Sequence, residues 1–190
     1  MQDISLHLLD IIENSIRAKA KLIRIKIIRE VMRNELIFIV ADDGTGMDEN
    51  TLYEAQNPFY TSKLEREKKV GLGIPLFKQN AEMCNGSFNI ESKLGEGTTI
   101  TSVFQYDHVD RMPLGKMEDT FVGSIIGHAD VDFEIILINN MITGKRDIFE
   151  FNTVAIKEEL GGVPINYPDV ITYVSEVIKE GIINTKMEEF

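Results

Sequence analysis

The chain has 190 residues, of which 43% are hydrophobic and 27% charged, a balance typical of a folded globular protein that buries a core. Its formal net charge of −11 argues against broad binding to nucleic acids or to anionic membrane surfaces. No apolar run approaches the length of a membrane span, the N-terminus lacks the features of a signal peptide, and a single cysteine, Cys84, excludes an internal disulfide. We therefore expect a cytoplasmic protein with neither nucleic acid nor membrane among its partners.

Residues 3–19 predict an amphipathic helix with two stripes of different character. One stripe is apolar, and the other aligns Asp10, Asn14 and Arg17 at spacings of four and three residues. A carboxylate, an amide and a guanidinium on one face suit a metal-bound polyphosphate. A solvated polar face with a Glu13–Arg17 pair explains the same spacing, and the helix taken alone favours that simpler interpretation.

Two strands and a glycine-containing loop follow the first helix. Residues 22–30 alternate between apolar and basic side chains, which indicates a half-buried strand, and residues 35–41 predict a more fully buried one. The segment 42–47, with the sequence DDGTGM, places two glycines at alternate positions after that strand. Such glycines mark backbone that bends or approaches another group closely. Asp48 is expected to cap a short helix that ends near residue 56.

The next part of the chain predicts a lid, a helix and a hairpin. Residues 57–70 are rich in both signs of charge and read as a long loop of the kind that often covers a site. Gly71-Leu72-Gly73 opens a helix over residues 73–84. Two further strands, 87–92 and 98–106, are joined by a glycine turn at 95–97. These elements predict an α+β fold in which helices cover one face of a mixed sheet.

The second half of the chain, residues 107–190, is less distinctive. Its predicted elements are a helix at 118–127, strands at 131–139 and 147–151 paired across Gly144, and helices at 153–160 and 168–183. The last helix is strongly amphipathic. We expect it to pack on the same sheet, and the alternative is a face that binds a partner.

Four sequence boxes resemble a known superfamily. The stretch LLDIIENSIRAKAKLIRIKI resembles the first helix and strand of mismatch-repair ATPases, whereas NPFYTSK, GLGIPLF and GEGTT resemble histidine kinases. Together, residues 4–104 resemble an ATP-binding domain of the GHKL superfamily. The resemblance implies the Bergerat fold, a two-layer sandwich of a mixed sheet with helices on one face. Residues 1–106 would form this domain, and residues 107–190 would form a C-terminal α/β extension of unknown role.

The resemblance also implies a site for ATP and Mg²⁺. Asn14 would ligate the metal, Asp42 would accept a hydrogen bond from the adenine amino group, and Thr98 would join the adenine contact through water. Lys63 would reach phosphate from the lid, although plain solvent exposure explains it equally well. The residues that the resemblance assigns to ATP are Asn14, Arg17, Asp42, Gly44, Gly46, Met47, Lys63, Gly71, Leu72, Gly73, Gly95, Gly97 and Thr98.

The candidate catalytic residue is Asp10, where many relatives of the superfamily carry a glutamate that activates water or a hydroxyl group. The aspartate is one methylene shorter, so Glu13 stays open as the alternative. A carboxylate at this place favours hydrolysis or phosphorylation of a hydroxyl, because a general base must take a proton from the attacking group.

These residues predict a Mg-ATP-binding protein of the histidine-kinase-like type. We expect a stand-alone regulatory kinase or slow ATPase that acts in signal transduction on an unidentified protein partner. The alternative is a non-catalytic binding module that ATP switches between two states. A histidine kinase carries its acceptor histidine before the ATP domain, whereas here that domain starts at the first residues; we therefore expect the acceptor on another protein, or a repurposed chemistry. The sequence also leaves a homodimer open.

Residues 108–114, HVDRMPL, resemble the phosphoacceptor box of histidine kinases. In this segment the acid, Asp110, stands one place late, and Pro113 would interrupt the helix that presents such a histidine. We expect the segment to be a connector and predict no autophosphorylation at His108.

Overall fold

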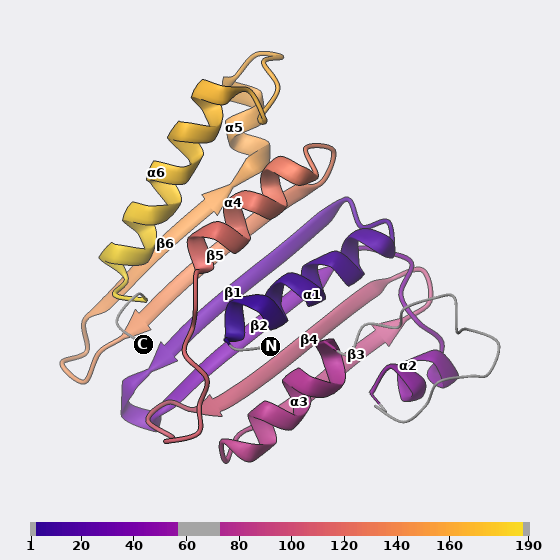
Figure 1. The fold of residues 1–190 in the computed structure, drawn as a ribbon, viewed down its shortest axis with the longest axis vertical. Helices are drawn as coiled ribbons and strands as arrows, with labels where there is room; N and C mark the ends of the chain where they lie inside the picture. Colours follow the sequence, from indigo (N-terminus) through magenta and orange to yellow (C-terminus); the bar gives the residue numbers. More distant parts are fainter. Residues whose placement is uncertain (1–2, 57–72, 188–190) are drawn as a thin grey trace.

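The computed structural model describes residues 3–56 and 73–187. The expected lid at 57–70, which contains Lys63, lies outside the described residues, as do Gly71 and Leu72. Within the described ranges, six strands form one mixed sheet in the order β3-β4-β2-β1-β5-β6 (Figure 1). The strands are β1 (Leu22–Glu30), β2 (Glu35–Asp42), β3 (Ser87–Lys93), β4 (Gly97–Gln105), β5 (Asp132–Asn140) and β6 (Arg146–Asn152). The helices are α1 (Ile4–Arg17), α2 (Glu49–Ala55), α3 (Gly73–Met83), α4 (Met117–Gly127), α5 (Thr153–Glu159) and α6 (Pro168–Asn184), with a short 3-10 turn η1 (Val31–Arg33).

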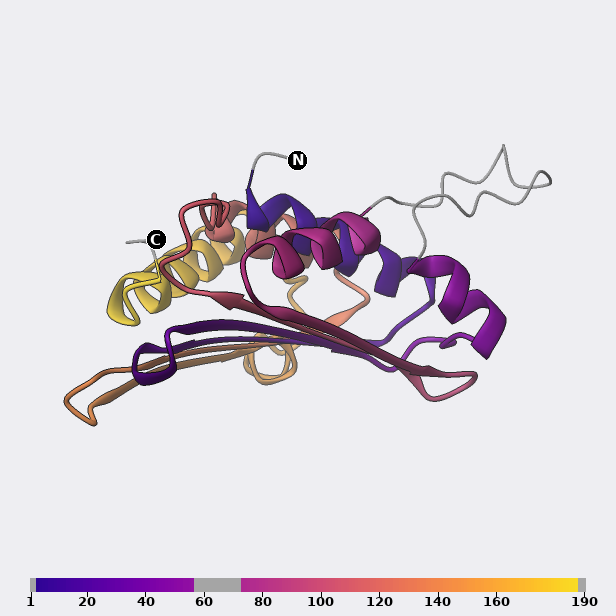
Figure 2. The same cartoon turned by 90° about the horizontal axis from the view of Figure 1, so that it is seen from below.

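The two halves of the chain contribute to the same sheet. Strands β1 to β4 pair antiparallel, whereas β5 runs parallel to β1 and pairs antiparallel with β6. Helices α1, α3, α4 and α6 lie on one face, and the short α5 lies below their level at the end of β6 (Figure 2). The predicted α+β fold, with a mixed sheet covered on one face, is confirmed. The second half extends this sheet sideways with β5 and β6 and adds helices to its covered face.

Helix α1 lies over the middle of the sheet with its apolar stripe buried. Asp3 caps the helix, because its Oδ1 accepts a hydrogen bond of 3.0 Å from the Leu6 backbone N–H. Leu8 and Ile12 of α1 and Ile25 of β1 are fully buried. Burying each such side chain stabilises the fold by about 1.5–3 kcal/mol, so the stripe fixes the rotation of α1 about its axis. That rotation sets where the polar stripe of the helix points.

An aromatic cluster locks α3 onto the sheet beside α1. Phe77 of α3 lies 5.4 Å from Phe104 and 6.0 Å from Phe38, measured between ring centroids. Phe38 and Phe104 meet edge to face at 5.7 Å, a favourable geometry for two aromatic rings. All three rings are fully buried. The start of α3 is thereby held close to α1.

The connector after β4 is tied to the first turn of α1. The backbone N–H groups of Ile4 and Ser5 donate to the carbonyls of Pro113 and Leu114, at 3.0 and 2.9 Å. Gly115 follows with a φ of +76°, and a Cβ atom there would lie 2.4 Å from the Asp3 side chain. Backbone carbonyls of the connector therefore accept hydrogen bonds from the start of α1 before α4 begins.

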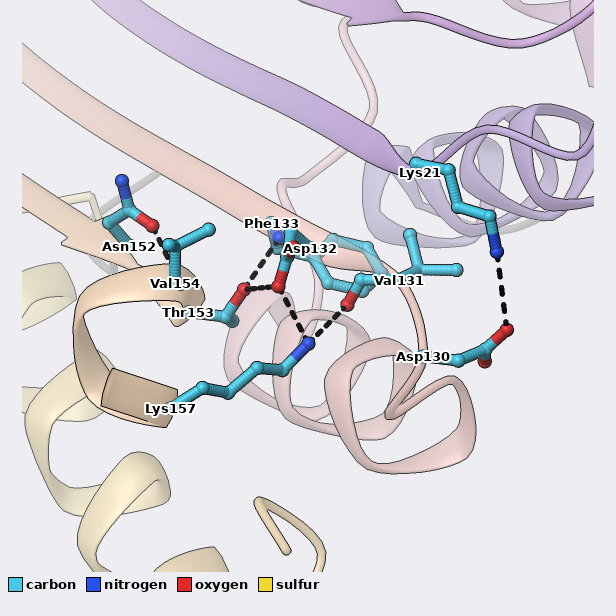
Figure 3. A network of polar contacts seen from close by, with 9 residues as sticks. All are labelled: Lys21, Asp130, Val131, Asp132, Phe133, Asn152, Thr153, Val154 and Lys157. Carbon is cyan, nitrogen blue, oxygen red and sulfur yellow. Dashed lines mark hydrogen bonds and ion pairs between the residues drawn. The ribbon is translucent and has the colours of Figure 1, made fainter. Parts of the chain in front are cut away.

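A polar network fastens α5 to the start of β5 (Figure 3). The Lys157 ammonium donates to Asp132 Oδ1 at 2.6 Å and to the Val131 carbonyl at 3.1 Å. The Thr153 hydroxyl donates to the same carboxylate at 3.1 Å and accepts from the Phe133 N–H at 2.8 Å. Half-buried charge-assisted contacts of this kind hold the end of β6 and the start of α5 in one position.

Candidate nucleotide site

Asp42 ends β2 with both carboxylate oxygens already oriented by the protein. Its Oδ2 accepts a 2.7 Å hydrogen bond from the Ser15 hydroxyl of α1, and its Oδ1 accepts one of 2.9 Å from the Gly44 N–H. The residue is half-buried, at the level where Thr98 pairs with it across the sheet. Each carboxylate oxygen accepts more than one hydrogen bond, so the group keeps acceptor capacity for a ligand.

The loop after Asp42 is fastened to the C-terminal end of α1 and to the start of β1. The Thr45 N–H donates to the Ala18 carbonyl at 2.8 Å. Asp43 accepts from the backbone N–H groups of Lys21 and Leu22 at 2.7 and 2.9 Å. Burial raises the pKa of Asp43, but these hydrogen bonds outweigh it and hold the pKa below its ordinary value. Asp42 and Asp43 thus have different roles. Asp42 faces the covered side of the sheet, and Asp43 anchors the loop.

At two glycines, one backbone segment approaches another too closely for any side chain to fit. Gly46 has a φ of +62°, and a Cβ atom there would lie 2.0 Å from the Lys93 carbonyl oxygen. Gly97 has a φ of +92°, and a Cβ atom there would lie 1.9 Å from the Asp42 carbonyl oxygen. Both positions require glycine for conformation and for space. Gly95 also has a positive φ, +82°, but nothing lies within 4 Å of a Cβ atom there.

A hydroxyl pair connects this loop to the β3–β4 hairpin. Ser92 Oγ accepts from the Met47 N–H at 2.8 Å and lies 3.0 Å from the Gly97 carbonyl oxygen. It also lies 2.9 Å from Thr98 Oγ1. Met47, Gly97 and Thr98, which the resemblance assigned to ATP, are therefore brought together with Asp42 at one end of β2 and β4.

The polar stripe of α1 lies beside this cluster. Arg17 donates to Asn14 Oδ1 at 3.3 Å, so these two predicted phosphate and metal residues are already in contact. Arg17 is exposed and Asn14 is half-buried. Within residues 3–56 and 73–187, no three His, Cys, Asp or Glu side chains form a group that could hold a metal ion. Mg²⁺ fits this site only as a cation that Asn14 and the phosphate oxygens hold together.

Asp10 lies where α1 meets the beginning of α3. A Cβ atom on Gly73 would lie 2.6 Å from the Asp10 Cβ and 2.8 Å from its Oδ2, so glycine alone allows this approach. One turn earlier, the fully buried His7 stacks on Phe77 at 5.6 Å and lies 3.2 Å from Asn80 Nδ2 through its Nε2. Burial lowers the pKa of His7, while the Asp10 carboxylate acts in the opposite direction.

Glu13, the alternative catalytic residue, faces the second half of the chain. Its Oε1 lies 3.3 Å from Nε2 of His128, which stands at the C-terminal end of α4. The Glu13–Arg17 pair of the alternative interpretation does not occur among the described residues, where Glu13 contacts His128 and Arg17 contacts Asn14. This carboxylate is therefore committed to a contact between the two halves, and Asp10 stays the better candidate for a general base.

His108 lies at the opposite end of β4 from Thr98. Gln105 lies seven positions after Thr98 along the strand, a span of about 23 Å at 3.3 Å per residue. His108 Nδ1 accepts from the Asp110 N–H at 3.2 Å within a tight turn, and the chain then attaches to α1 through Pro113. This geometry favours the connector interpretation.

Sequence reasoning missed the side chains that orient the predicted ones. Ser15 lies on the buried face of α1 among apolar side chains, yet its hydroxyl holds Asp42. Ser92 ends the predicted strand at 87–92, and its hydroxyl joins Met47 to Thr98. A serine on an otherwise apolar helix face is a signal for a buried hydrogen bond, since a hydroxyl buried without a partner is costly.

The chain is similar in sequence to a described family and to two kinases of one bacterium. The family described as "Histidine kinase-, DNA gyrase B-, and HSP90-like ATPase" matches residues 2–108. The chain is 30% identical over 98 residues to the sensor histidine kinase YvrG of Bacillus subtilis and 34% identical over 97 residues to sporulation kinase C of the same organism. These matches cover 50% and 51% of this chain but only 17% and 21% of the two relatives.

Among solved structures, the MutL ATPase domain of Aquifex aeolicus complexed with ADP is 13% identical, with a TM-score of 0.45, and the match covers 84% of this chain and 68% of that one. In the part of the chain that the structure describes, no helix combines the length and apolar character needed to cross a membrane. Because the family match spans more than half of the chain, the protein belongs to the family of histidine kinase-, DNA gyrase B- and HSP90-like ATPases, and its first half is a GHKL ATP-binding domain similar to those of histidine kinases.

Proposed function

We propose that the protein is a regulatory kinase or slow ATPase that binds Mg-ATP and acts on a protein partner. The observation that carries the proposal is the Asp42 carboxylate, oriented by Ser15 and Gly44 beside Thr98. A fixed acceptor at this place recognises the amino group of adenine. Guanine presents a carbonyl oxygen instead, which leaves two acceptors facing each other.

Calorimetric titration with ATP and GTP, with and without Mg²⁺, tests the binding step. We expect tight binding only for Mg-ATP, and Asp42→Asn should weaken it by about 1–3 kcal/mol, the scale of a hydrogen bond to a charged group. Asp43→Asn is the matched control, because it makes the same chemical change in the neighbouring side chain, which holds the loop backbone. Equal affinities for ATP and GTP, or equal losses in both variants, would overturn the proposal.

The kinase and ATPase forms of this proposal differ in where the γ-phosphate goes. Asp10, packed against Gly73, is the proposed general base for water or for a hydroxyl of the partner. With γ-labelled ATP, label recovered as inorganic phosphate indicates an ATPase, and label on an added protein indicates a kinase. Mg²⁺ supplies charge neutralisation at the phosphates when bound, and Asn14 would hold it.

The second candidate is a non-catalytic binding module, in which bound ATP changes the shape of the protein without being turned over. The Glu13–His128 contact favours it, because Glu13 precedes the proposed metal ligand Asn14 and His128 belongs to the second half of the chain. Parallel pairing of β5 with β1 joins the halves further. Stoichiometric ATP binding that slows hydrogen exchange in α4, with no phosphate release or transfer, would select the module.

A further inference from the structure

The edge strand β6 presents a side-chain pattern that is complementary to itself. Because the Phe149 ring of β6 lies against Gly181 of α6 and side chains alternate along a strand, Arg146, Ile148 and Glu150 point to the uncovered face of the sheet, and all three are exposed. The described residues offer no ion-pair partner to Arg146 or Glu150. We propose that β6 pairs antiparallel with β6 of a second copy of this chain, centred on Ile148, to form one continuous twelve-stranded sheet. This inference is independent of the proposed kinase or ATPase activity.

The backbone of β6 supports the same register. The Met141 N–H donates to the Lys145 carbonyl at 2.9 Å, so the peptide groups of Lys145 face β5. Because these groups alternate along a strand, those of Arg146, Ile148 and Glu150 point away from β5. Within the described ranges, no hydrogen bond occupies this outer edge. An antiparallel partner centred on Ile148 bonds with these same three residues.

The side chains then match in both directions. A twofold axis through Ile148 places each Arg146 directly opposite the Glu150 of the other copy, twice in the interface. Shifting the register by two residues in either direction loses both pairs. Opposite charges directly across an antiparallel pair are favourable, and like charges are unfavourable.

The interface also continues an existing apolar row. By the register of the sheet, Ile148 belongs to a row of residues that crosses five neighbouring strands. The other members of the row are Ile138, Ile28, Ile37 and Val103. By this register these side chains share the face to which Ile148 points, and Ile148 remains 48% exposed. A second β6 extends the row through a second Ile148 and covers part of this exposed side chain.

The other edge of the sheet lacks this design. On the same face, β3 presents the polar side chains of Ser87, Asn89, Glu91 and Lys93 along its whole length. Polar and charged residues of this kind protect an edge strand from pairing. The contrast supports β6 as the edge that receives a partner strand.

Light scattering after size exclusion measures the assembly directly. The wild-type chain should elute as a dimer, with twice its mass of 21.5 kDa. Arg146→Glu and Glu150→Arg should each be monomeric, because each places like charges opposite one another twice. The double variant Arg146→Glu/Glu150→Arg should dimerise again, and an equimolar mixture of the two single variants should form a mixed dimer. Glu91→Arg on β3 is the control and should remain dimeric.

The register has a separate readout in hydrogen exchange of the Ile148 amide. Its exchange should be slow in the wild type and at least tenfold faster in Arg146→Glu, while amides of β5 keep their protection. A monomeric wild type, a dimer that survives both single substitutions, a double variant that stays monomeric, or an Ile148 amide whose exchange is unchanged in Arg146→Glu would each overturn the proposal.

Discussion

Gly97 in the nucleotide-binding half and Gly144 in the second half both have a positive φ, +92° and +79°, but their surroundings are opposite. A Cβ atom on Gly97 would meet the Asp42 carbonyl oxygen at 1.9 Å, whereas one on Gly144 would meet nothing within 4 Å. Gly161 and Gly162, also in the second half, are as open as Gly144. Gly97 therefore brings two backbone segments together, whereas Gly144, Gly161 and Gly162 only turn the chain.

Several close approaches at glycine in the first half involve Asp42 and Asp10, which we assign to the proposed nucleotide site. Close approaches at Gly46 and Gly97 join the loop after β2 to the β3–β4 hairpin, and Gly73 at the start of α3 lies against the Asp10 side chain of α1. In the second half, polar contacts such as that of Lys157 with Asp132 hold α5 against the start of β5.

The largest test of this comparison is alanine at the two glycines. Gly97→Ala should destabilise the protein by about 2–5 kcal/mol and abolish ATP binding, because the collision with Asp42 adds to the backbone strain. Gly144→Ala carries only the strain of a left-handed residue and should cost about 1 kcal/mol, with ATP affinity unchanged. Urea unfolding and calorimetry measure both effects. Equal losses in the two variants would remove the distinction between the halves.

Asp10→Asn comes next in size and separates chemistry from binding. If the protein turns over ATP, the rate should fall about 10²-fold or more with little change in ATP affinity, as expected for a general base whose shape is kept. Glu13→Gln is the matched variant: the same change on the same helix, at a carboxylate that contacts His128. Phosphate release assays compare them. A larger loss in Glu13→Gln would move the catalytic role to Glu13.

Elements with a strong local pattern were predictable from the sequence. The strand at 22–30, the helix within residues 3–19 and the hairpin across Gly144 all form as expected, because alternation, helical periodicity and turn chemistry act over a few residues. The positions of Asp42 and Thr98 also followed from the resemblance, and the structure aligns the two residues across β2 and β4.

Contacts between distant residues could not be read in this way. Ser15 and Asp42 are 27 positions apart, and Glu13 and His128 are 115 apart. Each contact depends on how helices rotate and where strands insert, and parallel pairing of β5 with β1 decides the second one. The sequence pattern of a strand shows that it is buried but not which strand it joins.

Ser15→Ala tests whether orientation of Asp42 matters as much as its charge. Removing the hydroxyl leaves the carboxylate in place but frees its Oδ2, so ATP affinity should fall by about 0.5–1.5 kcal/mol. Ser124→Ala is a suitable control, because Ser124 is also a buried helical serine, but it donates within α4 to the Thr120 carbonyl. Calorimetry that shows no loss in Ser15→Ala would mean that Gly44 alone orients the carboxylate.

The smallest expected effect concerns His7, beneath the contact of α1 with α3. Its pKa is lowered from the ordinary 6.5, mainly by burial. Just below that pH, His7 therefore binds a proton in the unfolded chain but not in the folded chain. The unfolded state then carries more protons, and the free energy of unfolding must fall as the pH drops through this window. His7→Gln removes the titration and keeps an acceptor for Asn80. Between about pH 7.5 and pH 5.5, the urea midpoint should decline less in the variant than in the wild type. A parallel decline in both proteins would show that groups other than His7 control acid sensitivity. The contact of α1 with α3 would then not depend on a neutral imidazole.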